Sequence, residues 1–165
     1  MEIIEATFCD IERILEIMNS ARAFQRAMGF VQWLDGYPSH DDIMNDISNG
    51  GARIFTVDDK IIGYAYLTDF DNEYNRLNNI WKFGNRYGVI HRLAVDAEYR
   101  GHGCSTEMLQ LIENEFKQSD INAIRIDTGT ENIVMQHLLS KSGYECRDQQ
   151  SFIWGERLAY EKKLQ

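Results

Sequence analysis

The sequence predicts a mixed α/β fold, in which helices flank a central mixed sheet, within a single domain over residues 1–165. Segments with the two-residue alternation of strands take turns along the chain with segments whose apolar residues recur at the helical period. The 165 residues are 44% hydrophobic, which is enough to build one core. Since no repeat or low-complexity linker divides the chain, a second domain is not required.

The first half begins with a strand at 2–8, after which Asp10 can cap a helix. Residues 39–42 have the Ser-His-Asp-Asp pattern of a capping box and open a second helix, which ends before the glycine pair 50–51. Strands at 52–57 and 61–68 form a hairpin. The apolar positions of the first helix follow a period of 3.6 residues: Ile11, Ile14, Leu15, Met18 and Ala21.

The second half continues the alternation of strands and helices. Residues 70–87 predict a short helix over the sheet, because Tyr74, Leu77, Ile80 and Trp81 have helical spacing. The elements that follow are a strand at 88–96, a helix at 105–117, a strand at 122–127, a helix at 132–142, and a closing hairpin with strands at 151–154 and 157–163.

The turn between the strand at 88–96 and the helix at 105–117 is the most informative segment. It carries Gly101 and Gly103 directly before a helix N-terminus. Glycine lets consecutive backbone N–H groups converge, and the positive end of the helix dipole attracts negative charge. The turn therefore predicts a site for a cofactor that carries a diphosphate.

Composition and motifs exclude several classes of function. The chain has no P-loop run of Gly, four residues and Gly-Lys-Ser/Thr, and its glycine pair lacks the third glycine of a dinucleotide fingerprint. A net charge of −9 disfavours nucleic acid and membrane partners. Three widely separated cysteines predict neither a disulfide framework nor a metal site. Without an apolar run long enough for a membrane span or a signal peptide, we expect a cytoplasmic protein.

Two motifs resemble those of the GNAT superfamily of N-acetyltransferases. Arg100-x-x-Gly103-x-Ser105 resembles its Q/R-x-x-G-x-G/A signature, with serine in place of the last small residue. Downstream, residues 132–144 read Asn-x-x-Met-x-x-Leu-Leu-x-x-x-Gly-Tyr, which resembles the second landmark N-x-x-A-x-x-L-Y-x-x-x-G-F. The order of predicted elements is also similar to the GNAT fold over nearly the whole chain.

The resemblance implies that acetyl-CoA is the cofactor and binds where parallel strands four and five splay apart. It implies that the turn cradles the diphosphate, while the strand backbone and the asparagine of the second motif contact the pantetheine arm. From the residues alone, that asparagine can also be a helix N-cap. Position by position, the implied cofactor contacts are Leu93, Ala94, Val95, Arg100, Gly101, His102, Gly103, Cys104, Ser105, Thr106 and Asn132.

Transfer by this route is a direct attack of a primary amine on the acetyl group through a tetrahedral intermediate. His91 is the candidate general base, because its ordinary pKa of about 6.5 suits the task. Strand alternation also places it on the face of Leu93 and Val95. A core histidine satisfied by the backbone is the structural alternative.

The proton donor is less evident than the base. The family commonly has a tyrosine that acts as general acid where this chain has Leu139. Tyr144, Tyr160 or water must therefore protonate the departing thiolate, and Tyr144 is the candidate residue. Cys104, at a helix N-terminus, could act as a nucleophile. Its position in the motif normally carries an apolar residue that faces the core.

The aromatic loop before the second helix supplies candidate walls for the acceptor site, Trp33 and Tyr37, together with Tyr66. Asp35 or Asp69 could hold an ammonium group, although each of these residues could equally be a core aromatic or a solvated acid. We expect a primary amine of a small molecule or peptide as substrate. A homodimer is possible from the sequence. The alternatives are a non-catalytic coenzyme A binding or sensing module and a nucleotide-binding α/β protein.

Overall fold

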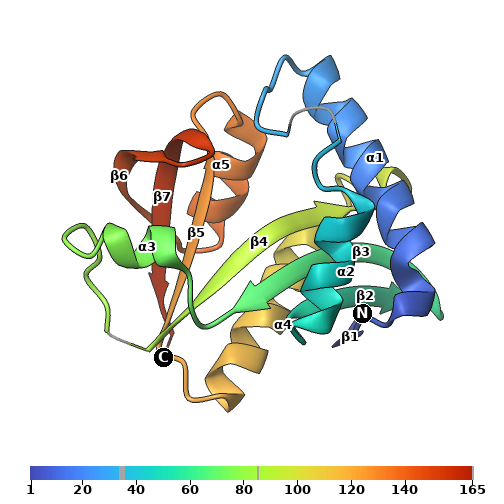
Figure 1. The fold of residues 1–165 in the computed structure, drawn as a ribbon, viewed down its shortest axis with the longest axis horizontal. Helices are drawn as coiled ribbons and strands as arrows, with labels where there is room; N and C mark the ends of the chain where they lie inside the picture. The colour runs from blue at the N-terminus through green and yellow to red at the C-terminus, as the bar shows by residue number, and fades with distance from the viewer. Residues whose placement is uncertain (34–35, 85, 165) are drawn as a thin grey trace. The chain divides into compact units, whose positions relative to one another are not determined.

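Residues 1–33, 36–84 and 86–164 are described by the computed structural model (Figure 1). They divide into two units. Unit 1 contains Met1–Leu67 and His91–Ile112, and unit 2 contains Thr68–Ile90 and Glu113–Gln165. Strand β4 (Tyr87–Val95) and helix α4 (Cys104–Gln118) each run from one unit into the other. Every helix within the described ranges is too short or too polar to cross a membrane.

Seven strands form a mixed sheet in the order β1-β2-β3-β4-β5-β7-β6. β4 and β5 are parallel, whereas antiparallel pairing joins β1 to β2, β2 to β3, β5 to β7 and β6 to β7. The mixed α/β fold predicted from the sequence is confirmed. The remaining strands are β1 (Glu2–Glu5), β2 (Ala52–Val57), β3 (Lys60–Thr68), β5 (Ala123–Gly129), β6 (Glu145–Phe152) and β7 (Gly155–Lys163).

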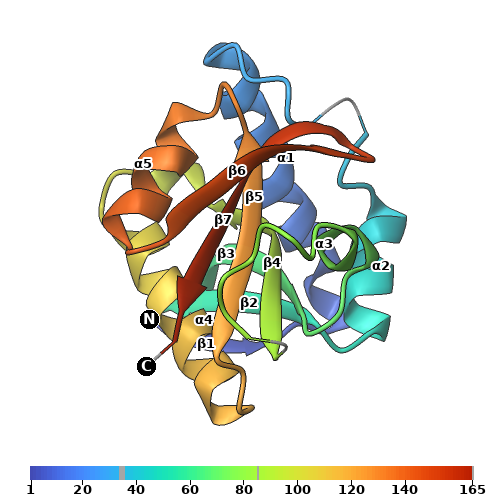
Figure 2. The same ribbon diagram turned by 90° about the vertical axis from the view of Figure 1, so that its left-hand side faces the viewer.

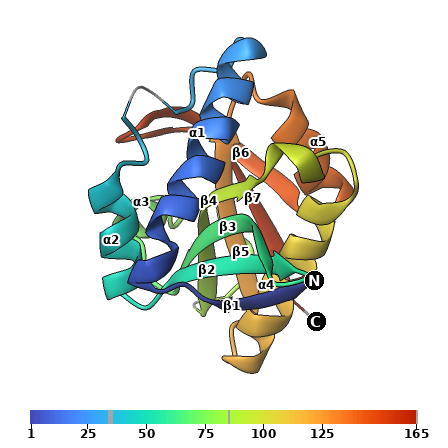
Figure 3. The ribbon, with the colours of Figure 1, turned by 90° about the vertical axis from the view of Figure 1, so that its right-hand side faces the viewer.

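In unit 1, helices α1 (Ile11–Ala27) and α2 (His40–Ser48) pack on one face of β2 and β3 (Figure 3). The apolar stripe predicted for α1 forms the contact, and its Ile14 and Met18 have no exposed surface. They pack with Ile54 of β2 and Tyr64 of β3. Burial of this stripe, rather than helix propensity, fixes α1 on the sheet.

The capping box predicted at the start of α2 is confirmed. The Oγ of Ser39 accepts a hydrogen bond from the N–H of Asp42 at 3.2 Å, and the carboxylate of Asp42 accepts one from the N–H of Ser39 at 2.7 Å. These reciprocal bonds satisfy two donors that the first turn leaves unpaired. The start of α2 is thereby fixed at a defined residue.

Helix α4 approaches the sheet closely at two glycines. In unit 1, a Cβ on Gly63 would come within 2.6 Å of the Cε of Met108. In unit 2, a Cβ on Gly88 would come within 2.4 Å of the ring of Phe116. Because Gly63 alternates with Tyr64 along β3, α4 covers the face of the unit 1 strands that α1 and α2 leave open.

In unit 2, strand β5 lies between β4 and β7 (Figure 2). The short helix predicted within 70–87 forms over Asn72–Arg76 as α3, and Trp81 stacks on Tyr74 with ring centroids 5.6 Å apart. Helix α5 spans Ile133–Lys141. One buried cluster of unit 2 contains Tyr74, Leu77, Tyr87, Val89, Ala123, Phe152 and Ala159.

A fully buried carboxylate, that of Glu161 on β7, organises the loop after α3. It accepts hydrogen bonds from the Nε atoms of Arg125 at 3.3 Å and Arg147 at 3.0 Å. The backbone N–H groups of Lys82 and Phe83 donate to the same carboxylate at 2.9 and 3.3 Å. Two cations and two N–H groups thus compensate the charge that burial would otherwise penalise.

Three boundaries differ from the sequence prediction. β1 ends at Glu5 rather than at residue 8, because a 3-10 turn, η1 (Phe8–Asp10), intervenes before α1. The carboxylate of Asp10 accepts from the N–H and hydroxyl of Thr7 at 2.7 and 2.8 Å instead of capping α1. β6 begins at Glu145 rather than at 151. Its largely exposed residues form an outer strand without an apolar pattern.

Candidate functional site

The turn between β4 and α4 is built on two left-handed glycines. It follows a short 3-10 helix, η2 (Ala97–Tyr99), and the φ angles of Gly101 and Gly103 are +79° and +84°. A Cβ at either position would meet no atom within 4 Å. Glycine is therefore required by the backbone conformation, and open space lies over the turn.

The backbone N–H groups of this turn form an anion nest. The N–H groups of Thr106 and Glu107 donate to the carbonyl of Gly103 at 3.0 and 3.2 Å, which starts α4. Within the described ranges, the N–H groups of residues 101–105 have no acceptor. Since the positive end of the α4 dipole lies at the same place, the turn fits the diphosphate that the sequence predicts there.

Arg100 anchors the turn to α1. Its Nη2 donates to the Oγ of Ser20 at 2.9 Å, and its guanidinium lies 4.9 Å from the ring centroid of Phe24. Burial lowers the pKa of Arg100, although an arginine stays charged at neutral pH. The side chain therefore holds the turn against α1.

Apart from Asn132, the other residues implied for the cofactor lie along one stretch of unit 1, from β4 to the first turn of α4. The pairing of β4 with β5 stops at Val89 and Arg125, so β5 does not pair with the backbone of 93–95. Ala94 is buried and His102 exposed, whereas the half-buried residues are Leu93, Val95, Cys104, Ser105 and Thr106.

Asn132, in unit 2, caps helix α5. Its Oδ1 accepts from the N–H of Met135 at 3.0 Å, and the residue is 8% exposed. The N-cap alternative left open by the sequence is therefore present, and a contact with the pantetheine arm stays a prediction. Leu139, at the position of the family tyrosine, is fully buried.

Tyr144, the candidate acid, is buried in unit 2. Its burial and the nearby Glu113 carboxylate raise the pKa of the phenol well above its ordinary value. Lys162 covers the ring, with Nζ 5.4 Å from the centroid. A phenol with a raised pKa holds its proton more tightly, which disfavours Tyr144 as a proton donor at neutral pH.

His91, the candidate base, lies half-buried on β4 and stacks on Tyr66, with ring centroids 6.1 Å apart. The next residue, Arg92, has a φ of +55°, a left-handed conformation that is uncommon outside glycine. Side chains alternate between the two faces of a strand only where every residue is extended. Because Arg92 is not extended, alternation does not place His91 on the same face of β4 as Leu93 and Val95.

A buried charged cluster lies beside His91, and sequence reasoning missed it. The Tyr64 hydroxyl donates to Oδ2 of Asp46 at 2.7 Å, and Nη1 of Arg92 lies 3.5 Å from Oδ1. Asp46 is 3% exposed, and burial raises the pKa of its carboxyl. The available hint was an arginine next to a histidine within the largely apolar strand 88–95.

The predicted acceptor residues divide between core and surface. Trp33 belongs to the buried cluster beneath α1 and α2, whereas Tyr37 is 40% exposed and lies with its ring centroid 5.5 Å from Cζ of Arg92. Asp69 is exposed, and Asp35 lies outside the described residues. The structure thus joins Tyr37 to the charged cluster and assigns Trp33 to the core.

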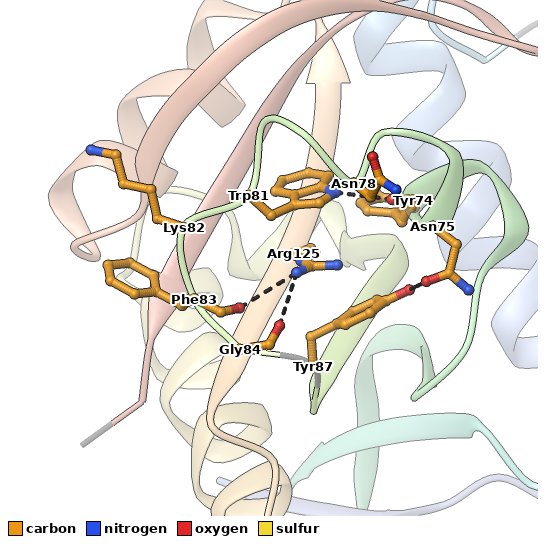
Figure 4. A pocket seen from close by; sticks show the side chains of 9 residues that line it. All are labelled: Tyr74, Asn75, Asn78, Trp81, Lys82, Phe83, Gly84, Tyr87 and Arg125. Carbon is orange, nitrogen blue, oxygen red and sulfur yellow. Dashed lines mark hydrogen bonds between the residues drawn. The ribbon is translucent and has the colours of Figure 1, made fainter.

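Unit 2 contains a separate cavity of about 410 Å³ between α3 and the start of β4 (Figure 4). Arg125 lies at its floor between two rings, with Cζ 3.6 Å from the centroid of Tyr87 and 4.6 Å from that of Trp81. Its Nη2 donates to the carbonyls of Phe83 and Gly84 at 3.4 and 3.2 Å. Because these carbonyls accept from Nη2, Arg125 holds the backbone at residues 83–84 in place.

Comparison with known proteins supports the acetyltransferase resemblance. The family model described as acetyltransferase (GNAT) family matches residues 12–144. A GNAT family acetyltransferase from Streptococcus agalactiae is 33% identical, with a TM-score of 0.90, and the match covers 99% of this chain and 95% of that chain. The PaiA N-acetyltransferase from Thermoplasma acidophilum, solved with coenzyme A, is 20% identical, with a TM-score of 0.77 and 98% coverage of each chain.

No curated protein gives a significant match to the sequence. The family match nonetheless includes β4, the glycine turn, α4 and the helix that carries the second motif. The Streptococcus agalactiae structure shares the arrangement of elements over almost the full length of both chains. The chain therefore belongs to the GNAT acetyltransferase family.

Proposed function

We propose that the protein is an N-acetyltransferase that transfers the acetyl group of acetyl-CoA to a primary amine of a small molecule or peptide. The observation that carries this proposal is the turn at 100–106, where unpaired N–H groups, left-handed glycines and a helix N-terminus fit a diphosphate. Because left-handed glycines under open space also occur at Gly29 and Gly50, the glycines support the proposal only together with the N–H groups at the start of α4 that have no acceptor in the described residues. Family membership supports the chemistry that such a cofactor would serve.

In this proposal the backbone of 101–105 holds the diphosphate, and Arg100 keeps the turn in place through Ser20. The backbone of 93–95, which β5 does not pair, is available to the pantetheine arm. Bound acetyl-CoA supplies an activated acetyl thioester. The protein then has to place and deprotonate the acceptor amine beside β4.

His91 is the proposed base. A lysine-like amine has a pKa of about 10.4, so it must lose a proton before its nitrogen can attack at neutral pH. Attack of that nitrogen on the acetyl carbon would give a tetrahedral intermediate, from which the carbon–sulfur bond then breaks, and His91 would accept the proton that the nitrogen loses. A thiol has a pKa of about 8.5, so the thiolate leaves without a strong acid and solvent can protonate it.

The test is release of free thiol from acetyl-CoA over a panel of amines, polyamines, aminoglycosides, amino acids and peptides, with the product identified by its mass. We expect turnover on one class and a mass increase of one acetyl group on nitrogen. Binding of coenzyme A without turnover of any amine would overturn the proposal that the protein is an enzyme. That outcome would support a coenzyme A binding module, the reading that a buried Leu139 in place of the family tyrosine favours.

A further inference from the structure

The charged cluster on β4 places a cation directly beside the proposed base. Arg92 follows His91 in the strand, and both contact the ring of Tyr66, with Cζ of Arg92 5.3 Å from its centroid. If His91 deprotonates the acceptor, as the proposed function requires, the rest of the acceptor molecule lies within reach of this guanidinium. The charge on Arg92 then bears on which amines the site accepts.

Most of the hydrogen-bonding capacity of Arg92 is unused. A guanidinium has five N–H donors. Within the described part of the chain, its one acidic partner is Asp46, and their 3.5 Å separation exceeds an ordinary charge-assisted hydrogen bond. Its Nε is buried without a partner. A single loose ion pair therefore leaves this arginine able to bind a second anion.

Two aromatic rings lie close to the guanidinium of Arg92. Cζ lies 5.5 Å from the ring centroid of Tyr37 and 5.3 Å from that of Tyr66. The N–H donors of a guanidinium lie in its plane and point outward from its edge. Tyr37 is 40% exposed and the Arg92 side chain 15%, so solvent reaches the cluster. A planar carboxylate matches such an edge through paired hydrogen bonds.

We propose that the acceptor is an amine that also carries a carboxylate, of the size of a free amino acid, and that Arg92 binds the carboxylate while His91 faces the amine. From the sequence alone, Asp35 or Asp69 could instead hold an ammonium group. In the described residues of unit 1, Tyr37 lies beside the Arg92 cation, and the buried carboxylate of Asp46 is already bonded to Tyr64. Polyamines and aminoglycosides, which carry no carboxylate, are therefore poor acceptors.

The test compares amino acids with their amides, which have nearly the same size and shape but lack the negative charge of the carboxylate. Wild type should show at least about tenfold higher kcat/KM for the acid, as expected for a charge-assisted hydrogen-bonded pair. Arg92→Gln should remove that preference, because kcat/KM for the acid falls toward the value for the amide. Arg53→Gln is the matched control, because Arg53 is 14% exposed on β2, and it should keep the wild-type ratio.

Because Arg92→Gln leaves Asp46 without its cation, the double variant Arg92→Gln with Asp46→Asn tests the same preference in a neutral cluster. Equal rates of wild type on acid and amide would overturn the proposal, as would a variant that loses both activities equally. If no amine is turned over, binding of an N-acetyl amino acid and of its amide is compared by NMR titration with coenzyme A present. If the wild type does not bind the N-acetyl amino acid more tightly than its amide in this titration, the inference is overturned independently of catalysis.

Discussion

At the scale of single residues, Arg92 and Asp46 are the costly members of unit 1. A left-handed residue other than glycine costs roughly 1–2 kcal/mol, and Arg92 adopts that conformation in the middle of β4. Burying a carboxylate costs several kcal/mol, on the order of the effective penalty for one ion, unless partners offset it. The Tyr64 hydroxyl and the Arg92 guanidinium are those partners. Two well-packed apolar residues could replace a buried ion pair such as Arg92–Asp46 without loss of stability. A role in binding therefore explains this ion pair better than a role in stability.

The first prediction concerns the pH dependence of stability. Burial raises the pKa of Asp46 above its ordinary value of 3.8, although Arg92 and Tyr64 oppose the shift. The folded state therefore binds a proton more tightly than the unfolded chain. That contribution is full below the ordinary pKa and is lost as the pH rises through the raised value. Relative to Asp46→Asn, the wild type should gain unfolding free energy as the pH falls from 7 to 4.5, measured by urea denaturation.

The control for this experiment is Asp41→Asn, which removes one negative charge from a 93% exposed side chain on the same helix. It separates the effect of burial from that of net charge. A wild-type advantage that is constant with pH, or that grows as the pH rises, would contradict the raised pKa of Asp46.

At the scale of elements, the sequence predicts best those features whose chemistry is local. The capping box at 39–42 and the hairpin of β2 and β3 depend on side chains near in sequence, and both form as predicted. The glycine turn before α4 likewise has the left-handed residues that its composition indicates. In the candidate site, the anion nest follows from sequence because glycines and a helix start suffice to build it.

The elements that sequence reasoning misplaces depend on contacts between distant segments. β6 forms by pairing with β7, and its exposed charged residues carry no strand pattern of their own. Similarly, the Arg92 cluster joins residues of α2, β3 and β4, and the break in β4 alternation comes from one backbone angle. Neither feature has a local sequence pattern, so the charged side of the candidate site was not predicted.

The second prediction tests the glycine turn against a matched glycine elsewhere. Gly103→Ala and Gly29→Ala both force a side chain into a left-handed position, with φ of +84° and +78°, where a Cβ meets open space. Each should lose roughly 1–2 kcal/mol of unfolding free energy. Only Gly103→Ala should weaken the thermal stabilisation by coenzyme A, because its Cβ fills the cradle of the nest. Equal stabilisation of both variants by the cofactor would contradict a diphosphate site at this turn.

At the scale of the molecule, two elements connect the units. α4 continues as one hydrogen-bonded helix from Cys104 to Gln118, and β4 continues from Tyr87 to Val95, although each is divided between unit 1 and unit 2. Each unit also contains a buried acid compensated by arginine, Asp46 in unit 1 and Glu161 in unit 2. Unfolding either unit alone would break a continuous helix and expose one of these charges. We therefore expect one cooperative unfolding transition.

The third prediction uses tryptophan fluorescence to follow each unit separately. Trp33 belongs to unit 1, while Trp81 and Trp154 belong to unit 2. A variant with Trp81→Phe and Trp154→Phe therefore reports on unit 1, and one with Trp33→Phe and Trp154→Phe reports on unit 2. In each variant, the urea midpoint from fluorescence should equal the midpoint from far-UV circular dichroism of the same sample, whatever stability the substitutions cost. A fluorescence transition that precedes the circular dichroism transition in one variant, and follows it in the other, would show that the units unfold independently.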